Sequence, residues 1–100
     1  MIKHIILWKL DDKYSSKELN EIKANAKREL EALVSKISGL SVMKIEINGI
    51  GSSNADMMLY SEFINKEALN EYKTHPEHVR VADGFVRPYT VQRLCLDFEV

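Results

Sequence analysis

Lys3-His4-Ile5-Ile6-Leu7-Trp8-Lys9-Leu10 is the segment that most constrains the structure of this 100-residue chain. It is dense in β-branched and aromatic residues, which is typical of a β-strand. Successive side chains of a strand point to opposite faces, and both faces are apolar here. Ile5 and Leu7 share one face, and Ile6, Trp8 and Leu10 share the other. A strand with two apolar faces belongs in the centre of a sheet that is covered on both sides.

The residues that follow predict a long helix. Ser15-Ser16-Lys17-Glu18 has the pattern of a capping box, in which the Ser15 hydroxyl accepts from the Glu18 amide and the Glu18 carboxylate reaches back. Apolar residues then recur at steps of three and four on one side of the helix. Gly39 suits the left-handed residue that terminates a helix. The apolar stripe comprises Leu19, Ile22, Ala26, Leu30, Leu33, Val34 and Ile37.

Three further strands and two short helices complete the chain. The patterns predict strands over residues 42–47, 55–64 and 91–100, the first of them at an edge of the sheet. Asn65 can cap one short helix, and Pro76 fits the first turn of another. The order β-α-β-β-α-β with right-handed crossovers predicts a ferredoxin-like α+β fold. In this fold a four-stranded antiparallel sheet carries its helices on one face.

Composition and charge limit the class of protein. The chain has 14 Lys and Arg against 15 Asp and Glu, so it lacks the basic excess that general binding to nucleic acid or acidic membranes requires. No apolar window approaches the roughly 18 residues of a membrane helix, and the first apolar run is too short for a signal-peptide core. Cys95 is the single cysteine, so no disulfide forms within the chain. We therefore expect one cytoplasmic domain over residues 1–100.

The second face of the sheet predicts a partner. Residues 55–64 are also apolar on both sides, because Met57 and Leu59 oppose Met58 and Tyr60. The helices of one chain cover only one face, and the other would leave an apolar patch in water. A second copy packed sheet to sheet would cover that patch; the alternative is a monomer that tolerates partial exposure. The residues expected at the homodimer interface are Ile6, Trp8, Met58 and Tyr60.

One dense polar cluster stands out, Tyr72-Lys73-Thr74-His75-Pro76-Glu77-His78. The proline biases His75 away from helical geometry, so Tyr72 lies in the last turn before a helix break and His78 in the first turn after it. A phenol with a pKa of about 10 and an imidazole with a pKa of about 6.5 can act as an acid–base pair. His78 would take a proton next to a carbonyl while Tyr72 donates to the developing oxyanion. The alternative is a structural polar plug, with His75 or Thr74 capping the next helix.

Other chemistries find little support in the sequence. His75 and His78 are three residues apart and His4 is the only other imidazole, but the break at Pro76 spoils helical ligand spacing. No metal site is therefore expected. The chain has no recognisable catalytic triad, P-loop or dinucleotide fingerprint, and no cofactor is expected. Cys95 is interpreted as a small packed residue of the last strand.

The chain resembles the stress-responsive dimeric α/β-barrel (Dabb) family over almost its whole length. The string Tyr-x-x-His-Pro-x-His within residues 68–79 is the most specific element, and residues 3–10, Glu62-Phe63 and Asp97-Phe98 also match. The resemblance implies a homodimer whose two sheets form a barrel. It also implies a small apolar pocket between each sheet and its own helices.

The same resemblance implies candidate residues. Plant polyketide cyclases of the family use the matching tyrosine and second histidine for an aldol-type ring closure, which carries over to Tyr72 and His78 as catalytic residues. His4 matches a histidine that lines the pocket. We expect His4 and His75 to contact the ligand.

Two hypotheses about function remain open. Many family members are known only as stress-response proteins, so the chain is either a stress-related dimer that binds a small apolar or phenolic molecule, or a cofactor-free enzyme acting on a polyketide-like or phenolic substrate. A cavity of at least about 300 Å³ that receives both the Tyr72 hydroxyl and the His78 ring would favour a ligand site or an enzyme. Side chains packed shut or splayed into solvent would favour a structural role.

Overall fold

A computed structural model describes all 100 residues. The sheet consists of β1 (Ile2–Leu10), β2 (Leu40–Glu46), β3 (Met57–Phe63) and β4 (Thr90–Glu99), in the spatial order β2-β3-β1-β4. Every neighbouring pair is antiparallel. The predicted ferredoxin-like fold is confirmed, with β1 and β3 in the centre and β2 at an edge. None of the helices is long and apolar enough to cross a membrane.

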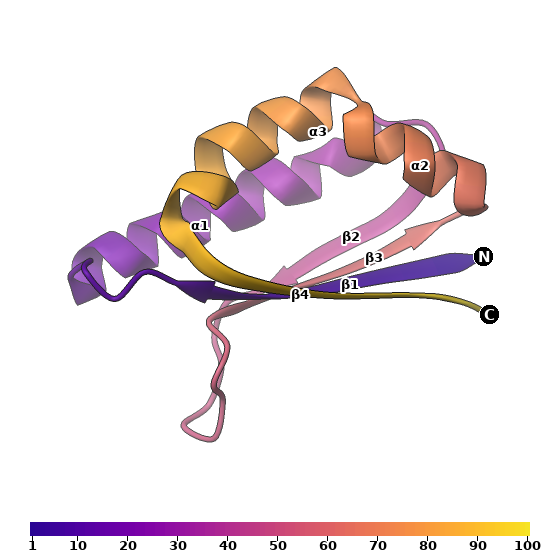
Figure 1. Cartoon of the computed structure of the whole chain (residues 1–100). Coiled ribbons are helices and arrows are strands. Elements are labelled where there is room, and N and C mark those ends of the chain that lie inside the picture. Colours follow the sequence, from indigo (N-terminus) through magenta and orange to yellow (C-terminus); the bar gives the residue numbers. More distant parts are fainter.

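Helices form a layer on one face of the sheet (Figure 1). They are α1 (Ser16–Glu31), α2 (Lys66–Thr74) and α3 (Pro76–Val81). A single 3₁₀ turn, η1 (Ala32–Ser35), follows α1, whereas α3 continues into the π-helical turn η2 (Ala82–Val86) and the 3₁₀ turn η3 (Arg87–Tyr89). The loop between β2 and β3 projects from the sheet on the side away from the helices (Figure 1).

The local signals in the sequence correspond to observed caps. Ser15 and Glu18 form both hydrogen bonds of the predicted capping box at the start of α1. The Asn65 side chain accepts a hydrogen bond from the Ala68 amide at the start of α2, at 2.8 Å. Gly39 has a φ of +85°, a backbone conformation that glycine adopts without the steric cost of a side chain. These caps fix where the helices begin and how the chain enters β2.

The helix-covered face of β1 corrects one prediction. Ile6 and Trp8 are only 5% exposed and lie in the core beneath the helices, so the expectation that they face a second copy is wrong. Both faces of β1 are apolar, and alternation alone does not tell which face the helices cover. The flanking lysines carry that information, because Lys3 and Lys9 share the opposite face with Ile5 and Leu7.

The opposite side of the sheet is apolar and uncovered by this chain. We call it the free face. Leu94 lies opposite Leu7, and Leu96 lies opposite Ile5, so apolar side chains are paired across β1 and β4. Met58 and Tyr60 of β3 extend the patch, and their place in a dimer interface stays a prediction. The free face consists of Ile5, Leu7, Met58, Tyr60, Leu94, Leu96 and Phe98.

Strand β4 has no helix over it. Its residues from Val91 to Glu99 are all exposed, including Cys95, so the interpretation of Cys95 as a packed core residue is wrong. Cys95 lies opposite Ile6 and therefore shares the helix-side face of the sheet. Because β4 is exposed on this side as well, its polar residues here remain accessible.

Replacing Gly39 by alanine tests the turn before β2. A Cβ at this position would lie 2.6 Å from the Ala68 Cβ and would have to adopt a positive φ. We expect Gly39→Ala to lower the free energy of unfolding by about 2 kcal/mol or more, measured by urea denaturation. Gly51→Ala is the matched control, because a Cβ there meets no atom within 4 Å. Equal stability of the two variants would contradict the assignment.

Candidate functional site

A cavity of about 430 Å³ lies between the helix-covered side of the sheet and the α2–α3–η2 segment. Its floor is apolar and includes Ile6 and Trp8, the two residues that the sequence pattern placed at the dimer interface. Its polar wall brings together residues that are far apart in the sequence. The lining residues are His4, Ile6, Trp8, Leu30, Leu59, Tyr72, Lys73, His78, Ala82, Val86, Arg87, Thr90 and Arg93.

Tyr72 and His78 meet in this cavity. Tyr72 lies in the last turns of α2 and is buried, with its ring packed edge-on against Phe63 at a centroid distance of 5.0 Å. The chain breaks at His75 and restarts as α3, which carries the His78 ring over Tyr72. The two ring centroids are 4.0 Å apart, with an angle of 31° between the planes. The helix break therefore stacks the imidazole on the phenol.

The hydrogen bonds of His78 leave one ring nitrogen open. The Nδ1 of His78 lies 3.3 Å from the carbonyl oxygen of Lys73, which only accepts, so Nδ1 carries the proton. Burial lowers the pKa of His78 below its ordinary value, and the Lys73 carbonyl offsets only part of this effect. At neutral pH the ring is therefore neutral, with a free electron pair on Nε2.

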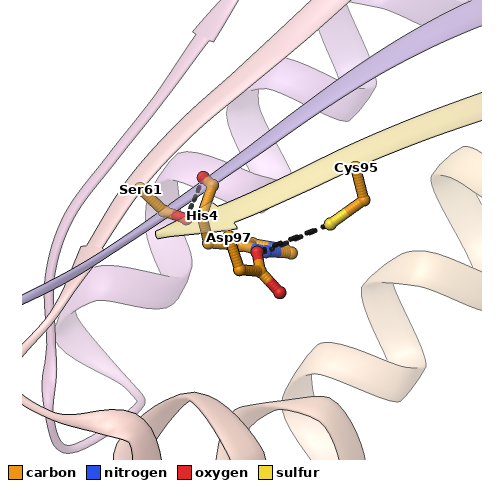
Figure 2. Close-up of polar contacts among 4 residues, drawn as sticks. All are labelled: His4, Ser61, Cys95 and Asp97. Atoms are coloured by element: carbon orange, nitrogen blue, oxygen red, sulfur yellow. Dashed lines mark hydrogen bonds and ion pairs between the residues drawn. The ribbon is translucent and has the colours of Figure 1, made fainter. Parts of the chain in front are cut away.

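Asp97 of the neighbouring strand fixes the same tautomer in His4, with the proton on Nδ1. The Nδ1 of His4 and a carboxylate oxygen of Asp97 are in direct contact, and the Ser61 hydroxyl donates to the His4 backbone carbonyl at 2.8 Å (Figure 2). Burial lowers the pKa of His4, although Asp97 acts in the opposite direction. Burial raises the pKa of Asp97, but His4 and nearby positive charge outweigh it and hold the pKa below its ordinary value. The pair is therefore a neutral imidazole that donates to an ionised carboxylate.

Three polar atoms of the tyrosine and the two histidines that line the cavity are available to a ligand. The Tyr72 hydroxyl and the Nε2 atoms of His4 and His78 make no hydrogen bond to another residue. No fully buried side-chain nitrogen or oxygen lacks a partner, so these atoms reach accessible space. Burial raises the pKa of Tyr72 well above its ordinary value, which keeps the phenol protonated. The cavity thus presents one O–H donor and two basic nitrogens.

His75 does not belong to the site. Its Nδ1 accepts a hydrogen bond from the Glu77 amide at 3.1 Å and so caps α3. It does not line the cavity, so the expectation that His75 contacts a ligand there is wrong. The alternative that His75 caps the next helix is correct. A histidine before a proline at the first helical position is placed to satisfy a helix amide, and that local demand decides its orientation.

The potential metal ligands of this region form a hydrogen-bonded triad. His4, Cys95 and Asp97 place one ligand atom each within 4.8 Å of one another (Figure 2). The Cys95 sulfur lies 3.4 Å from a carboxylate oxygen of Asp97, and burial together with this carboxylate raises the pKa of the thiol. The positive charge of Lys73 acts on all three groups. A neighbouring cation and a protonated thiol favour hydrogen bonding over binding of a metal cation.

Sequence reasoning missed the cationic part of the wall. Lys73, Arg87 and Arg93 line the cavity, and no motif in the sequence identifies them as site residues. A signal existed for Arg93: in the last strand the apolar residues alternate with Arg93, Cys95 and Asp97. That second set had to lie on the helix side once the leucines of the strand were assigned to the free face. Lys73 and Arg87 lie in helical turns whose orientation the sequence alone does not fix.

Comparisons with known proteins agree with this architecture. The family model described as the stress responsive A/B barrel domain (Dabb) matches residues 2–100. The chain belongs to the Dabb family. A dimeric protein of unknown function and ferredoxin-like fold from Bacteroides fragilis is 33% identical, with a TM-score of 0.92 over 99% of this chain and 95% of that one.

Two plant relatives extend the comparison. A stress-response A/B barrel domain-containing protein of Arabidopsis thaliana is 30% identical over 98% of this chain, and the chain spans only 36% of that protein's length. The hydroxynitrile lyase of Passiflora edulis is 15% identical, with a TM-score of 0.72 over 97% of this chain and 90% of that one. At this identity the likeness shows a shared fold, and Dabb proteins therefore share a scaffold that an enzyme also uses.

Titration of the histidines tests the electrostatics of the site. We expect the His4 and His78 rings to titrate below 6.5, followed as ring proton shifts by NMR, because burial lowers both pKa values. Asp97→Asn removes the charge that raises the His4 pKa, so His4 should titrate at still lower pH. Asp12→Asn, in an exposed turn, should change neither value. A rise of the His4 pKa in Asp97→Asn would contradict the assignment.

Proposed function

We propose that this Dabb protein binds a small organic molecule in the cavity and moves a proton on it, with His78 as base and Tyr72 as hydrogen-bond donor. The observation that carries the proposal is the opening of the Tyr72 hydroxyl and of His78 Nε2 into one cavity of about 430 Å³. This volume lies within the range of small-molecule sites, about 300–1,000 Å³.

The protonation states suit the removal of a proton next to a carbonyl group. Neutral His78 accepts the proton from the α-carbon on Nε2, and the electron pair of the broken C–H bond moves onto the carbonyl oxygen. The protonated Tyr72 donates a hydrogen bond to that oxygen as negative charge develops there. The resulting enolate then takes a proton back or attacks a second carbonyl, and His78 returns the proton. An acid–base pair of this kind contributes typically about 10²–10⁴-fold to a rate.

His4 supplies a second positioned nitrogen. Asp97 fixes its Nδ1–H and so leaves the Nε2 electron pair free, as the aspartate of a catalytic triad does for its histidine, although Asp97 is exposed here. Its ring centroid lies 6.2 Å from that of Tyr72. We assign His4 to ligand binding, as an acceptor for a hydroxyl or phenol of the bound molecule.

A specific observation favours a second candidate, binding without turnover. The strongly raised pKa of Tyr72 makes the phenol a weak proton donor. A weak acid still donates hydrogen bonds to a ligand, so the same cavity would serve a carrier or sensor. The two candidates differ in whether isotope exchange accompanies binding.

Hydrogen–deuterium exchange tests the catalytic proposal without knowledge of the natural substrate. In deuterated buffer, we expect the protein to accelerate exchange at the α-carbon of at least one member of a panel of aryl alkyl ketones, measured by NMR. His78→Gln should lower the enzyme-dependent rate by about 10²-fold or more, and Tyr72→Phe should also lower it. His75→Asn is the control, because asparagine also caps a helix and His75 lies outside the cavity.

The outcomes separate the two candidates. Binding of a ketone without exchange would overturn the catalytic proposal and leave the binding protein. Exchange that persists in His78→Gln and Tyr72→Phe would remove both residues from the mechanism. Loss of exchange in His75→Asn would show that the effect arises from altered folding of α3.

We also propose that the protein forms a homodimer through the free face. Leu94 and Leu96 are 59% and 64% exposed in the single chain. Solved relatives from Bacteroides fragilis and Thermobifida fusca are described as dimeric, with TM-scores of 0.92 and 0.79. The loop between β2 and β3 projects toward the same side and carries Ile50, which is 77% exposed (Figure 1). A second copy placed on this face would cover these side chains, and a stable interface needs about 1,600 Å² in total.

A charge on the free face tests the dimer. We expect Leu96→Glu to give monomers or insoluble protein in light scattering, because a buried carboxylate without a partner costs several kcal/mol in an apolar interface. Val34→Glu is the control, since Val34 is an exposed apolar residue of η1 in the helical layer. A wild-type monomer, or a normal Leu96→Glu dimer, would contradict the interface.

A further inference from the structure

The cavity wall is strongly biased toward positive charge. Three of the residues that line it, Lys73, Arg87 and Arg93, are cations, and no aspartate or glutamate lines it. The chain as a whole has a formal net charge of −1. The cations come from the end of α2, from η3 and from β4, so three separate elements converge on one space. The cavity wall is therefore positively charged, although the chain as a whole carries a slight negative charge.

Two of these cations have no carboxylate partner. Neither Lys73 nor Arg93 has an acidic oxygen within the 4.0 Å of a salt bridge, whereas Arg87 pairs with Asp83, which lies outside the cavity lining. Asp97 experiences the charge of Lys73, but its carboxylate is already engaged by His4. The two cations of the cavity are thus left without charge compensation. Six of the 14 lysines and arginines form salt bridges, and Lys73 and Arg93 are the two unpaired ones that line the cavity.

The positive field extends across the cavity to the acid–base groups. The charges of Arg93 and Arg87 act to lower the pKa of Tyr72, against the larger effect of burial. Arg93 and Lys73 act in the same direction on the pKa of His4, and Arg87 does so on that of His78. Strand register places Arg93 directly opposite Trp8, so Arg93 adjoins the apolar floor. A ligand in contact with the floor therefore lies within reach of at least one free cation.

We propose that the cavity selects an amphiphilic anion, an organic acid whose apolar body lies on the floor and whose carboxylate lies against Arg93 and Lys73. The inference rests on the proposed small-molecule site and names its ligand class. A neutral apolar ligand would displace water from the part of each cation that faces the cavity and would offer that part no hydrogen-bond acceptor. A carboxylate restores the lost interactions, and the guanidinium fork of Arg93 matches its two oxygens.

The anionic class also suits the proposed chemistry. Removal of a proton next to a carbonyl places negative charge on an oxygen, and the same positive field stabilises that charge. The carboxylate would be the fixed anchor, and the reacting carbonyl would lie toward Tyr72 and His78. The apolar floor then sets the shape of the body, through Ile6, Trp8, Leu30, Leu59, Ala82 and Val86.

Three probes of almost equal shape test the inference: 2-naphthoate, the neutral 2-naphthamide and the cationic 2-naphthamidine. Binding is measured by calorimetry, and NMR shifts of Tyr72 and His78 locate it in the cavity. We expect the naphthoate to bind at least about tenfold more tightly than the amide, and the amidine to bind most weakly. Raising the salt concentration should reduce the difference in affinity between the three probes, because salt screens the partly exposed cations.

Variants of the cations provide the matched comparison. Arg93→Gln and Lys73→Gln should each weaken naphthoate binding by about five- to tenfold and leave naphthamide binding unchanged. Arg93→Lys keeps the charge and should retain most of the preference. Lys17→Gln removes the same charge from an exposed turn of α1 away from the cavity, and naphthoate affinity should not change.

The results distinguish this inference from the proposed site. Equal binding of all three probes in the cavity would overturn the anion preference and leave the ligand site standing. Equal weakening of naphthoate by Lys17→Gln would reduce the preference to a general charge effect and also overturn it. If none of the probes shifts the Tyr72 and His78 signals, the ligand site itself is wrong, and the anion preference falls with it.

Discussion

Both faces of strand β1 are apolar and each needs a layer to cover it, and most of the structure follows from that constraint. It lies between β3 and β4 and is apolar on both faces, so a single layer of helices leaves half of its apolar surface in water. Its own helices cover the side of Ile6 and Trp8, and the side of Ile5 and Leu7 remains open. The fold therefore fixes the location of the internal cavity and of the surface available to a partner, on opposite sides of one strand.

The cavity arises because the helical layer is narrower than the sheet. The helices cover one face of β2, β3 and β1, whereas β4 is exposed on both sides from Val91 to Glu99. At this border the chain also breaks at His75 and Pro76, and the two short helices on either side meet at an angle that an unbroken helix would not allow. The break turns the Tyr72 and His78 rings toward each other above the floor. A cavity that is partly open to solvent, with polar atoms on one wall, is the result.

The fold could be predicted from the sequence because the helix caps, the turn glycine and the strand patterns all indicate the same arrangement. The caps at Ser15 and Asn65, the left-handed Gly39 and the alternation of the strands all have observed counterparts. The convergence of Tyr72 and His78 was accessible for the same reason, since a proline marks a break whose geometry is local. The choice of face for Ile6 and Trp8 was not local, because it depends on which side the helices take. Lys3 and Lys9 indicated that side, but their signal is weaker than that of the apolar residues around them.

His75 and the cationic wall show two different limits on what the sequence alone can predict. The sequence offers two roles for His75, a ligand contact and a helix cap, and the hydrogen bond that His75 accepts from the Glu77 amide at the folded helix end decides between them. Lys73, Arg87 and Arg93 belong to three elements separated by up to 20 positions, and nothing in their spacing predicts that they line one cavity. Tertiary packing decides which charged residues lie close together, whereas helix caps and strand alternation depend on residues that are near in sequence.

Burial and charge act on the acid–base groups in a way that links binding to protonation. Burial keeps His4 and His78 neutral and Tyr72 protonated, and the positive charges of the wall act to lower the pKa values of all three groups. A bound carboxylate would neutralise much of that positive field. The pKa values of the two histidines would then rise toward the ordinary range, where an imidazole is a stronger base. Without the proposed anion, the two histidines are neutral bases of low strength. With the anion bound, the same nitrogens would be more basic when they accept the substrate proton.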